Sequence, residues 1–211
     1  TDNNAGEVAE VAPAVEYTAF AQLLVEQGEC PVRAPDPFAN LGIQFTSGTT
    51  SRPKAVLWTH ANTIWGAQMN ASHMRLSGDD ITLAFLPLFH TNAQSYSMLG
   101  SLWVGGTIVV QPRFSASRFW PTARKYKCTW TSLIPFCVKA LLSQDPPPDH
   151  SFRFWNPAIR MIDVETTYGI PTFGWWGMTE TITHGIVGDI DHPGENMSIG
   201  RVSPGYDIEV R

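Results

Sequence analysis

From residue 41 onward, short apolar runs that are typical of strands alternate with segments of helical spacing. Strands are expected at 41–45, 55–58, 81–86, 107–110 and 128–135, and helices at 59–74, 92–104, 115–127 and 136–143. Parallel strands need a helix-sized crossover connection, so this alternation favours an α/β fold with a largely parallel sheet flanked by helices. The 211 residues, of which 43% are hydrophobic, are enough to form such a core.

Composition excludes several classes of protein. The net charge of −5 and the absence of a basic stripe argue against nucleic-acid binding. Three cysteines that are odd in number and widely spaced argue against a disulfide scaffold or a zinc site, and fit a reducing compartment. No apolar run approaches the roughly 20 residues of a membrane span, and no signal peptide opens the chain. We therefore expect a soluble, cytoplasmic protein.

The segment 45–56, with the sequence FTSGTTSRPKAV, is the most informative part of the chain. Hydroxyl side chains surround Gly48, and Lys54 follows within one loop length, between two expected strands. Hydroxyls and free backbone N–H groups can surround a polyphosphate, and a lysine can offset its charge. The spacing matches neither the Walker A loop nor the dinucleotide glycine fingerprint.

This segment resembles the phosphate-loop signature of the adenylate-forming superfamily, with Ser51 and Ala55 in place of two glycines. The resemblance implies part of the large N-terminal domain of such an enzyme, with the small C-terminal domain absent. It also implies that the β- and γ-phosphates of ATP are held by Thr46, Ser47, Gly48, Thr49, Thr50 and Lys54.

Two later segments match the same family in the family's order. The segment 86–90 (LPLFH) resembles its Pro-x-Phe-His motif, which implies that His90 lies beside the reacting carboxylate. The segment 174–180 (GWWGMTE) resembles its aromatic-Gly-x-Thr-Glu motif. There the resemblance implies adenine contacts for Trp176, α-phosphate contacts for Thr179, a Mg²⁺ ligand in Glu180, and further nucleotide contacts for Trp175, Gly177 and Met178. His90, Thr179 and Glu180 form the expected catalytic set.

Trp175 stands where family members that take long or aryl acids usually have glycine. A bulky ring there is expected to shorten the acyl pocket, which His90 also borders, so we expect a short or compact carboxylic acid. No aspartate lies near His90, which disfavours the amino-acid-activating branch. The strings WWGMTETITHGIVGD and TTSRPKAVLWTHAN are most similar to the crotonobetaine/carnitine-CoA ligase-like group of acyl-CoA synthetases.

The resemblance implies an acyl-CoA ligase that uses ATP, Mg²⁺ and coenzyme A, forms acyl-AMP with release of pyrophosphate, and then forms a thioester. Two alternatives stay open: an acyl-AMP ligase that loads a carrier protein, and a non-catalytic nucleotide-binding fragment. Small molecules are the expected partners, with neither nucleic acid nor a membrane span; a homodimer is left open.

We expect residues 1–34 to be a leader and linker with one helix at 17–27, and residues 35–211 to be the core of the adenylation domain, in part. The ribose-binding aspartate and the adenylation lysine of the family are not found in the sequence. Family members carry a loop and a helix between the strand expected near 160–162 and Tyr168. Their apparent loss predicts a gap at 162/163, because a strand without its crossover would leave an unpaired edge.

Overall fold

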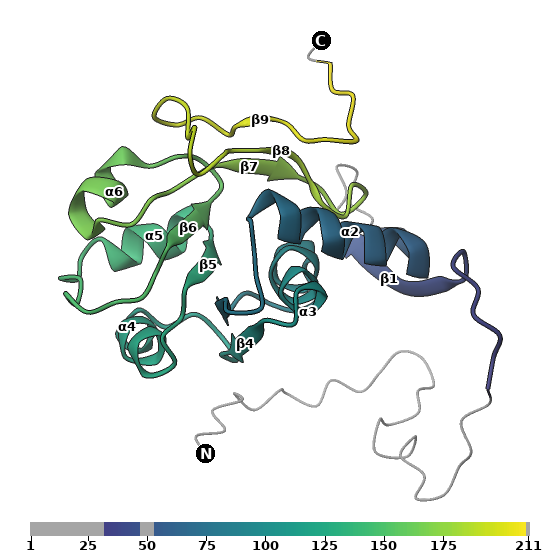
Figure 1. Cartoon of the computed structure of the whole chain (residues 1–211), viewed down its shortest axis with the longest axis horizontal. Helices are drawn as coiled ribbons and strands as arrows, with labels where there is room; N and C mark the ends of the chain where they lie inside the picture. The colour runs from purple at the N-terminus through teal and green to yellow at the C-terminus, as the bar shows by residue number, and fades with distance from the viewer. Residues whose placement is uncertain (1–31, 47–52, 210–211) are drawn as a thin grey trace, which may run out of the picture. The chain divides into compact units, whose positions relative to one another are not determined.

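The computed structural model describes residues 32–46 and 53–209. The chain divides into two units, residues 1–35 and 36–211, and nearly all described residues belong to the second unit. The helix expected at 17–27 lies outside the described residues. The described residues of the second unit form three separate sheets, and the largest of them is parallel (Figure 1).

The parallel sheet has the strand order β4-β3-β5-β6. Its strands are β3 (Ile81–Ala84), β4 (Thr107–Val110), β5 (Trp130–Leu133) and β6 (Phe154–Pro157). Every neighbouring pair is parallel, so the carboxyl ends of all four strands meet at one edge. This confirms the expected α/β class. The segments that follow β3 and β6 therefore lie at the edge where such sheets bind ligands.

Helices cover both faces of this sheet. The connections contain α4 (Ala116–Lys125), α5 (Pro135–Leu141) and α6 (Ile162–Tyr168) on one side, and η1 (Asn92–Leu99), α3 (Gly100–Trp103) and α2 (His60–His73) on the other. Alternate strand residues point to opposite faces. Thus Leu83 packs in the core with α4 and α5, whereas the Thr82 hydroxyl meets the Ser101 hydroxyl of α3 at 2.5 Å.

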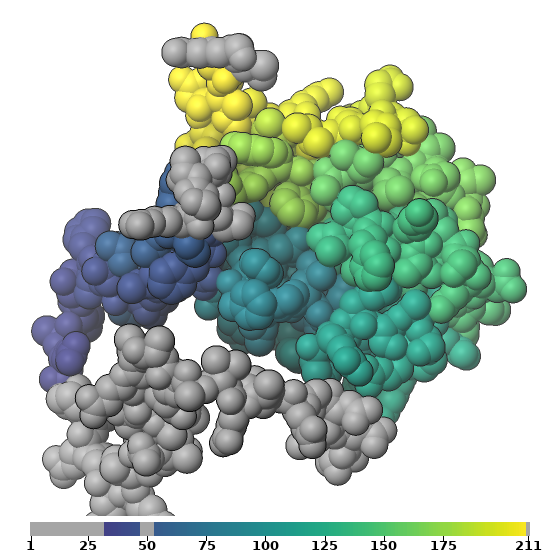
Figure 2. All heavy atoms as spheres, turned by 180° about the vertical axis from the view of Figure 1, so that it is seen from behind, coloured from purple at the N-terminus to yellow at the C-terminus, as the bar shows by residue number. Residues whose placement is uncertain are grey.

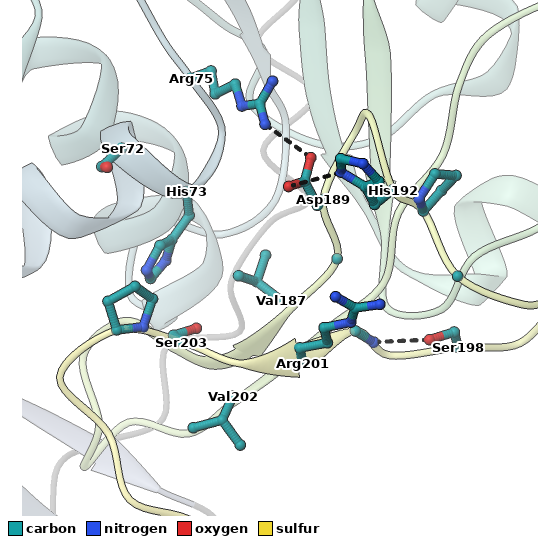
Figure 3. A pocket seen from close by; sticks show the side chains of 15 residues that line it. Ser72, His73, Arg75, Val187, Asp189, His192, Ser198, Arg201, Val202 and Ser203 are labelled. Atoms are coloured by element: carbon teal, nitrogen blue, oxygen red, sulfur yellow. Dashed lines mark hydrogen bonds and ion pairs between the residues drawn. The ribbon is translucent and has the colours of Figure 1, made fainter.

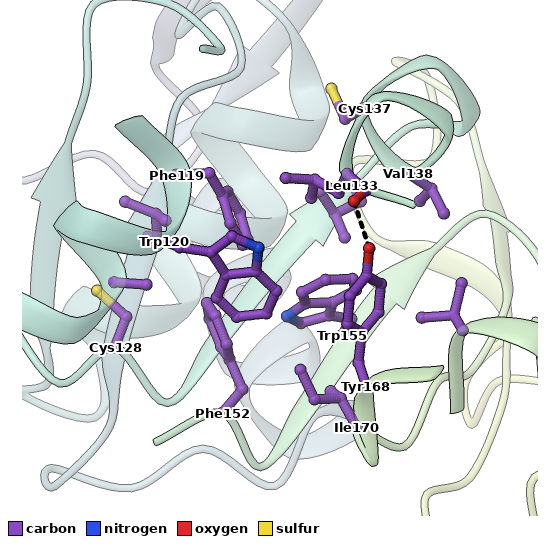
Figure 4. Close-up of a cluster of buried hydrophobic side chains, with 14 of the residues drawn as sticks. Phe119, Trp120, Cys128, Leu133, Cys137, Val138, Phe152, Trp155, Tyr168 and Ile170 are labelled. Carbon is purple, nitrogen blue, oxygen red and sulfur yellow. Dashed lines mark hydrogen bonds between the residues drawn. The ribbon is translucent and has the colours of Figure 1, made fainter. Parts of the chain in front are cut away.

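Aromatic side chains dominate the core between the sheet and helices α4 to α6 (Figure 4). Trp155 of β6 meets Phe119 edge to face, with ring centroids 5.5 Å apart, and Trp120 at 5.6 Å. The Tyr168 hydroxyl at the end of α6 donates to the Leu141 carbonyl at the end of α5. Several of the eight tryptophans therefore have a packing role rather than a role in a binding site.

A buried carboxylate joins the entrances to three strands. Asp80, just before β3, accepts hydrogen bonds from the Arg153 guanidinium at 2.8 to 3.0 Å and from the Thr129 hydroxyl at 2.7 Å. Burial alone would raise the pKa of Asp80, but the bonds from Thr129, Ser77 and Arg153 outweigh burial and lower it below its ordinary value. Asp80 thus fixes β3, β5 and β6 at the edge opposite the candidate site.

Two antiparallel sheets complete the unit. Strands β1 (Asn40–Thr46) and β2 (Lys54–Thr59) confirm the expected strand-loop-strand, and Thr59 caps α2 in a reciprocal capping box with Asn62. Strands β7 (Trp175–Gly177), β8 (His184–Val187) and β9 (Arg201–Val202) form the other sheet. Figure 1 shows this C-terminal part, coloured yellow-green to yellow, along one side of the parallel sheet, and Figure 2 shows the same colours gathered on one side of the surface.

The strand expected near 160–162 was wrongly placed. The strand lies at β6, residues 154–157, and α6 begins at Ile162, so the crossover helix that had seemed lost is present. Its last turn closes at Gly169, which adopts a left-handed conformation with φ of 65°. The gap expected at 162/163 and the limits of the two expected domains stay predictions.

Candidate functional site

The candidate site lies at the carboxyl edge of the parallel sheet. His90 follows β3 after the turn that begins at Pro87, whose carbonyl accepts the His90 backbone N–H at 2.9 Å. The His90 side chain is exposed and lies beside the Phe89 ring, with centroids 4.6 Å apart. Trp175 reaches the same edge from β7, because its indole N–H donates to the carbonyl of Asn156 in β6 at 3.2 Å.

A shallow depression of about 190 Å³ brings two of the expected motifs together. Its lining combines the segment after β3 with the segment from β7 to the following turn: His90, Thr91, Asn92, Tyr96, Trp175, Gly177, Met178 and Thr179. His90 and Thr179 are far apart in the sequence, yet they border one cavity. The structure thus assembles the residues that the resemblance assigned to the acyl group and the α-phosphate.

One wall of this depression is aromatic. Trp175 and Tyr96 meet edge to face with ring centroids 5.3 Å apart. The ring centroid of the fully buried His184 lies 4.0 Å from that of Tyr96 and 5.4 Å from that of Trp175. A Cβ atom at Gly177 would clash with the Tyr96 hydroxyl, so glycine is required for this close approach. Burial raises the pKa of Tyr96, which keeps its hydroxyl protonated and able to donate.

The sequence did not single out Thr91, Asn92 and Tyr96. The Thr91 hydroxyl and both amide atoms of Asn92 are shielded from solvent and have no hydrogen-bond partner among the residues that the structure describes. Such unpaired groups are rare in folded proteins, and a bound molecule would satisfy them. Their segment had been predicted as an ordinary helix, but η1 is a π-helix, a form often found at functional sites.

Strands β1 and β2 carry the two ends of the predicted phosphate loop. Thr46 ends β1 and pairs with Lys54, the first residue of β2, so the two close the base of the loop. Ser47, Gly48, Thr49 and Thr50 lie outside the described residues. In β2, the Trp58 indole N–H donates to the carbonyl of Thr179 at 3.1 Å, which ties the strand to the predicted α-phosphate residue.

A second tie comes from β1, where the Gln44 side chain donates to the Gln94 side chain in η1. Both strands that bear the loop are therefore attached to segments that line the depression. These two bonds bring β1, β2, the histidine segment and the threonine segment into one structural neighbourhood.

Three other predicted residues project outward. Trp176 is 40% exposed and its ring lies over Gly185, Met178 is 42% exposed, and Glu180 is exposed in the turn after Thr179. An exposed flat ring fits adenine stacking. A free carboxylate fits Mg²⁺, which keeps several waters and takes few protein ligands beside substrate phosphates. Within residues 32–46 and 53–209, no group of three or more His, Cys, Asp or Glu side chains could hold a metal ion.

Comparison with known proteins agrees with this geometry. The family model described as "AMP-binding enzyme" matches residues 2–211, and the chain belongs to this family. A crotonobetaine/carnitine–CoA ligase of Salmonella arizonae is 37% identical over 192 residues, which cover 86% of this chain and 36% of that protein. The Salmonella typhi protein of the same name is 35% identical over 207 residues, covering 91% and 39%. The chain thus spans under two fifths of these relatives' length.

Solved structures show the same fold. O-succinylbenzoate coenzyme A synthetase from Bacillus subtilis, in complex with AMP, superposes with a TM-score of 0.74 at 26% identity, over 87% of this chain and 49% of that one. A benzoate CoA ligase from Burkholderia xenovorans superposes with a TM-score of 0.73 at 21% identity, over 84% and 37%. The expected adenylate-forming class is therefore confirmed. No helix among the described residues has the length and apolar character needed to cross a membrane.

Proposed function

We propose that this chain carries the nucleotide- and acyl-binding core of an ATP-dependent acyl-CoA ligase. The observation that supports this most directly is the shared depression lined by His90, Trp175 and Thr179, to which β1 and β2 are tied. The names of the relatives, which are CoA ligases, support the same reaction class. As proposals, we also retain coenzyme A as the thiol acceptor and the cytoplasm as the location.

The reaction has two balanced steps. A carboxylate oxygen attacks the α-phosphorus of ATP, the bond from that phosphorus to the bridging oxygen breaks, and pyrophosphate leaves. The thiolate of coenzyme A then attacks the acyl carbon of the mixed anhydride, and AMP leaves with the bonding pair. The chain's residues position reactants and offset charge rather than form covalent bonds.

The roles follow from position. Thr46, Lys54 and the loop between them would hold the β- and γ-phosphates, and the Thr179 hydroxyl would donate to an α-phosphate oxygen. His90 would border the carboxylate, and Trp176 would stack on adenine. Glu180 would hold Mg²⁺, which offsets phosphate charge when it is bound.

The acid is expected to be short or compact. The Trp175 ring is fixed by its bond to the Asn156 carbonyl and by its contacts with Tyr96 and His184, so it closes the wall of the depression. Crotonobetaine and carnitine, after which the relatives are named, are compact acids, and we include them among the candidates.

The test is pyrophosphate release from ATP with a panel of carboxylic acids that includes crotonobetaine and carnitine, with and without Mg²⁺ and coenzyme A. We expect release with a compact acid, a loss of at least tenfold in Lys54→Ala, and no loss in Lys139→Ala, which removes an exposed lysine of α5. Release that requires a carrier-protein thiol for turnover would favour the acyl-AMP ligase alternative. ATP binding without release under any condition would favour the nucleotide-binding fragment.

A further inference from the structure

A larger cavity of about 320 Å³ lies away from the residues of the candidate site. It is bounded by the C-terminal end of α2 and by the segment from the end of β8 to the turn after β9 (Figure 3). Arg75, Asp189, Arg201, Ser203 and His73 contribute its polar side chains, with His192 and the Ser72 and Ser198 hydroxyls at its border. None of the residues predicted for nucleotide or acyl binding lines it.

The two arginines of this cavity differ in their partners. The Arg75 guanidinium is paired with Asp189 at 2.9 Å and with Asp191, and these partners raise the pKa of Arg75. The Arg201 side chain has no ion pair or hydrogen bond among residues 32–46 and 53–209. Its positive charge therefore faces the cavity without an offsetting carboxylate, while Asp189 is already engaged by Arg75.

Uncharged polar groups without partners also line this cavity. Ser203 is 3% exposed, and its hydroxyl has no partner within the described part of the chain. Neither ring nitrogen of His73 has a partner there either, and burial lowers the pKa of His73 to about 4, so the ring is neutral at pH 7. Figure 3 shows the His73 ring and the Ser203 hydroxyl on the same side of the cavity.

A free guanidinium that shares a cavity with unpaired hydroxyl and imidazole groups matches one ligand chemistry. Arginine presents planar N–H donors that fit carboxylate and phosphate oxygens in pairs, and such charge-assisted bonds are stronger than neutral ones. A serine hydroxyl turns among staggered positions and can donate to the same anion. The neutral His73 ring supplies one further N–H donor.

We propose that this cavity binds the carboxylate or phosphate group of a small molecule, with Arg201 as the charged anchor and Ser203 and His73 as neutral donors. The site is separate from the one proposed for ATP and the acid. Two rings lie between them: the half-buried His73 ring lies 6.2 Å, centroid to centroid, from the buried His184 ring, which packs against Tyr96 in the wall of the depression.

Histidine NMR can test this site directly, because His73 and His192 border the cavity and the other histidines lie elsewhere. The 211-residue chain would be labelled at histidine Cε1 and titrated separately with inorganic phosphate and acetate at constant ionic strength. We expect a saturable shift of the His73 resonance with at least one of the two anions. His150, which lies against Trp120 and Phe152 in the aromatic core, serves as the internal reference that should not move.

Two variants make the result specific. In Arg201→Gln the apparent affinity should weaken at least tenfold. Arg113→Gln removes an exposed arginine that also has no partner within the described part of the chain, and it should leave the Kd unchanged. An anion bound at the predicted phosphate loop would still bind in Arg201→Gln. Only the part of the His73 shift that is lost in Arg201→Gln therefore supports the proposal. A His73 shift that fails to saturate, or that is equal in both variants, would overturn the proposal. If only phosphate or only acetate gives a saturable shift, the natural ligand binds through a phosphate or through a carboxylate group, respectively.

Discussion

At the scale of single residues, the candidate site depends on a few side chains whose positions the sequence could not give. The motifs identified His90, Trp175 and Thr179, and the structure places these three around one depression. Tyr96, Thr91 and Asn92 carry no local signal, because they become wall residues through the path of η1 rather than through a motif. Substitutions at Trp175 and Tyr96 separate the size of the cavity from its hydrogen bonding.

Trp175→Gly removes a ring that closes the wall beside Tyr96. We expect kcat/KM for acids longer than the best wild-type substrate to rise about tenfold, which is ~1.4 kcal/mol of transition-state stabilisation. The measurement is pyrophosphate release across a chain-length series. Trp103→Gly, which removes a tryptophan at the end of α3, is the control and should not change the profile. An unchanged length preference in Trp175→Gly would contradict the size argument.

Tyr96→Phe keeps the ring contacts with His184 and Trp175 and removes the hydroxyl beside Gly177. Because burial raises the pKa of Tyr96, the hydroxyl is a donor throughout the physiological pH range. We expect kcat/KM to fall about tenfold if this donor bonds the bound acid, a loss of ~1 to 1.5 kcal/mol. The unfolding midpoint should stay the same, and equal kcat/KM in both proteins would exclude a role for the hydroxyl.

At the scale of elements, much of the order of strands and helices could be predicted, because hydrophobic periodicity and turn residues are properties of short stretches of sequence. Strands β3 and β4 and helix α2 lie within two residues of the ranges expected for them, 81–86, 107–110 and 59–74. The error at 160–162 has a physical reason: β6 is a fully buried four-residue strand, and so short a run gives no alternation to read. The antiparallel pairing of β7 to β9 was likewise decided by contacts between distant residues.

The hydrogen bonds that Asp80 accepts from Arg153 and Thr129 predict where a substitution most destabilises the parallel sheet. Asp80→Ala leaves Arg153 and the Thr129 hydroxyl without their shared acceptor. Because the Arg153 side chain is 42% exposed and can be resolvated, we expect a loss of about 1.5 kcal/mol, the lower end for hydrogen bonds to a charged group. Urea denaturation should show this loss, while Asp79→Ala, an exposed neighbour, should change the unfolding free energy by less than about 0.5 kcal/mol. Similar losses of unfolding free energy in both variants would show that the hydrogen bonds to Asp80 are not the cause.

At the scale of the whole molecule, pH links the buried histidines to global stability. Burial lowers the pKa of His73 from 6.5 to about 4, and it also lowers that of His184, which the neighbouring His73 lowers further. The unfolded chain therefore binds more protons than the folded chain between these values, so stability falls as the pH falls. Asp80, whose pKa is lowered from 3.8, is stabilising above that value, and its contribution is lost at more acidic pH.

Unfolding free energies measured by urea between pH 7 and pH 4.5 should consequently decline. His73 alone should contribute up to about 1.4 kcal/mol per pH unit below its unfolded pKa. His73→Gln should flatten this dependence, and His60→Gln, at an exposed position in the first turn of α2, should preserve it. Parallel pH curves for the wild type and His73→Gln would rule out this origin.

The π-helix after His90 also affects how this chain is compared with others. Each of its hydrogen bonds spans five residues rather than four, so η1 accommodates more residues per turn than an α-helix between the same two ends. A homologue with an α-helix here needs fewer residues to connect the same neighbours, and its side chains leave the axis at different angles. If residues of the two chains were matched by counting forward from His90, Tyr96 would be paired with a residue on another face of the homologue's helix. Equivalent positions beyond His90 are therefore found by superposition, and an insertion or deletion within 92–99 alters the wall of the site without changing the fold around it.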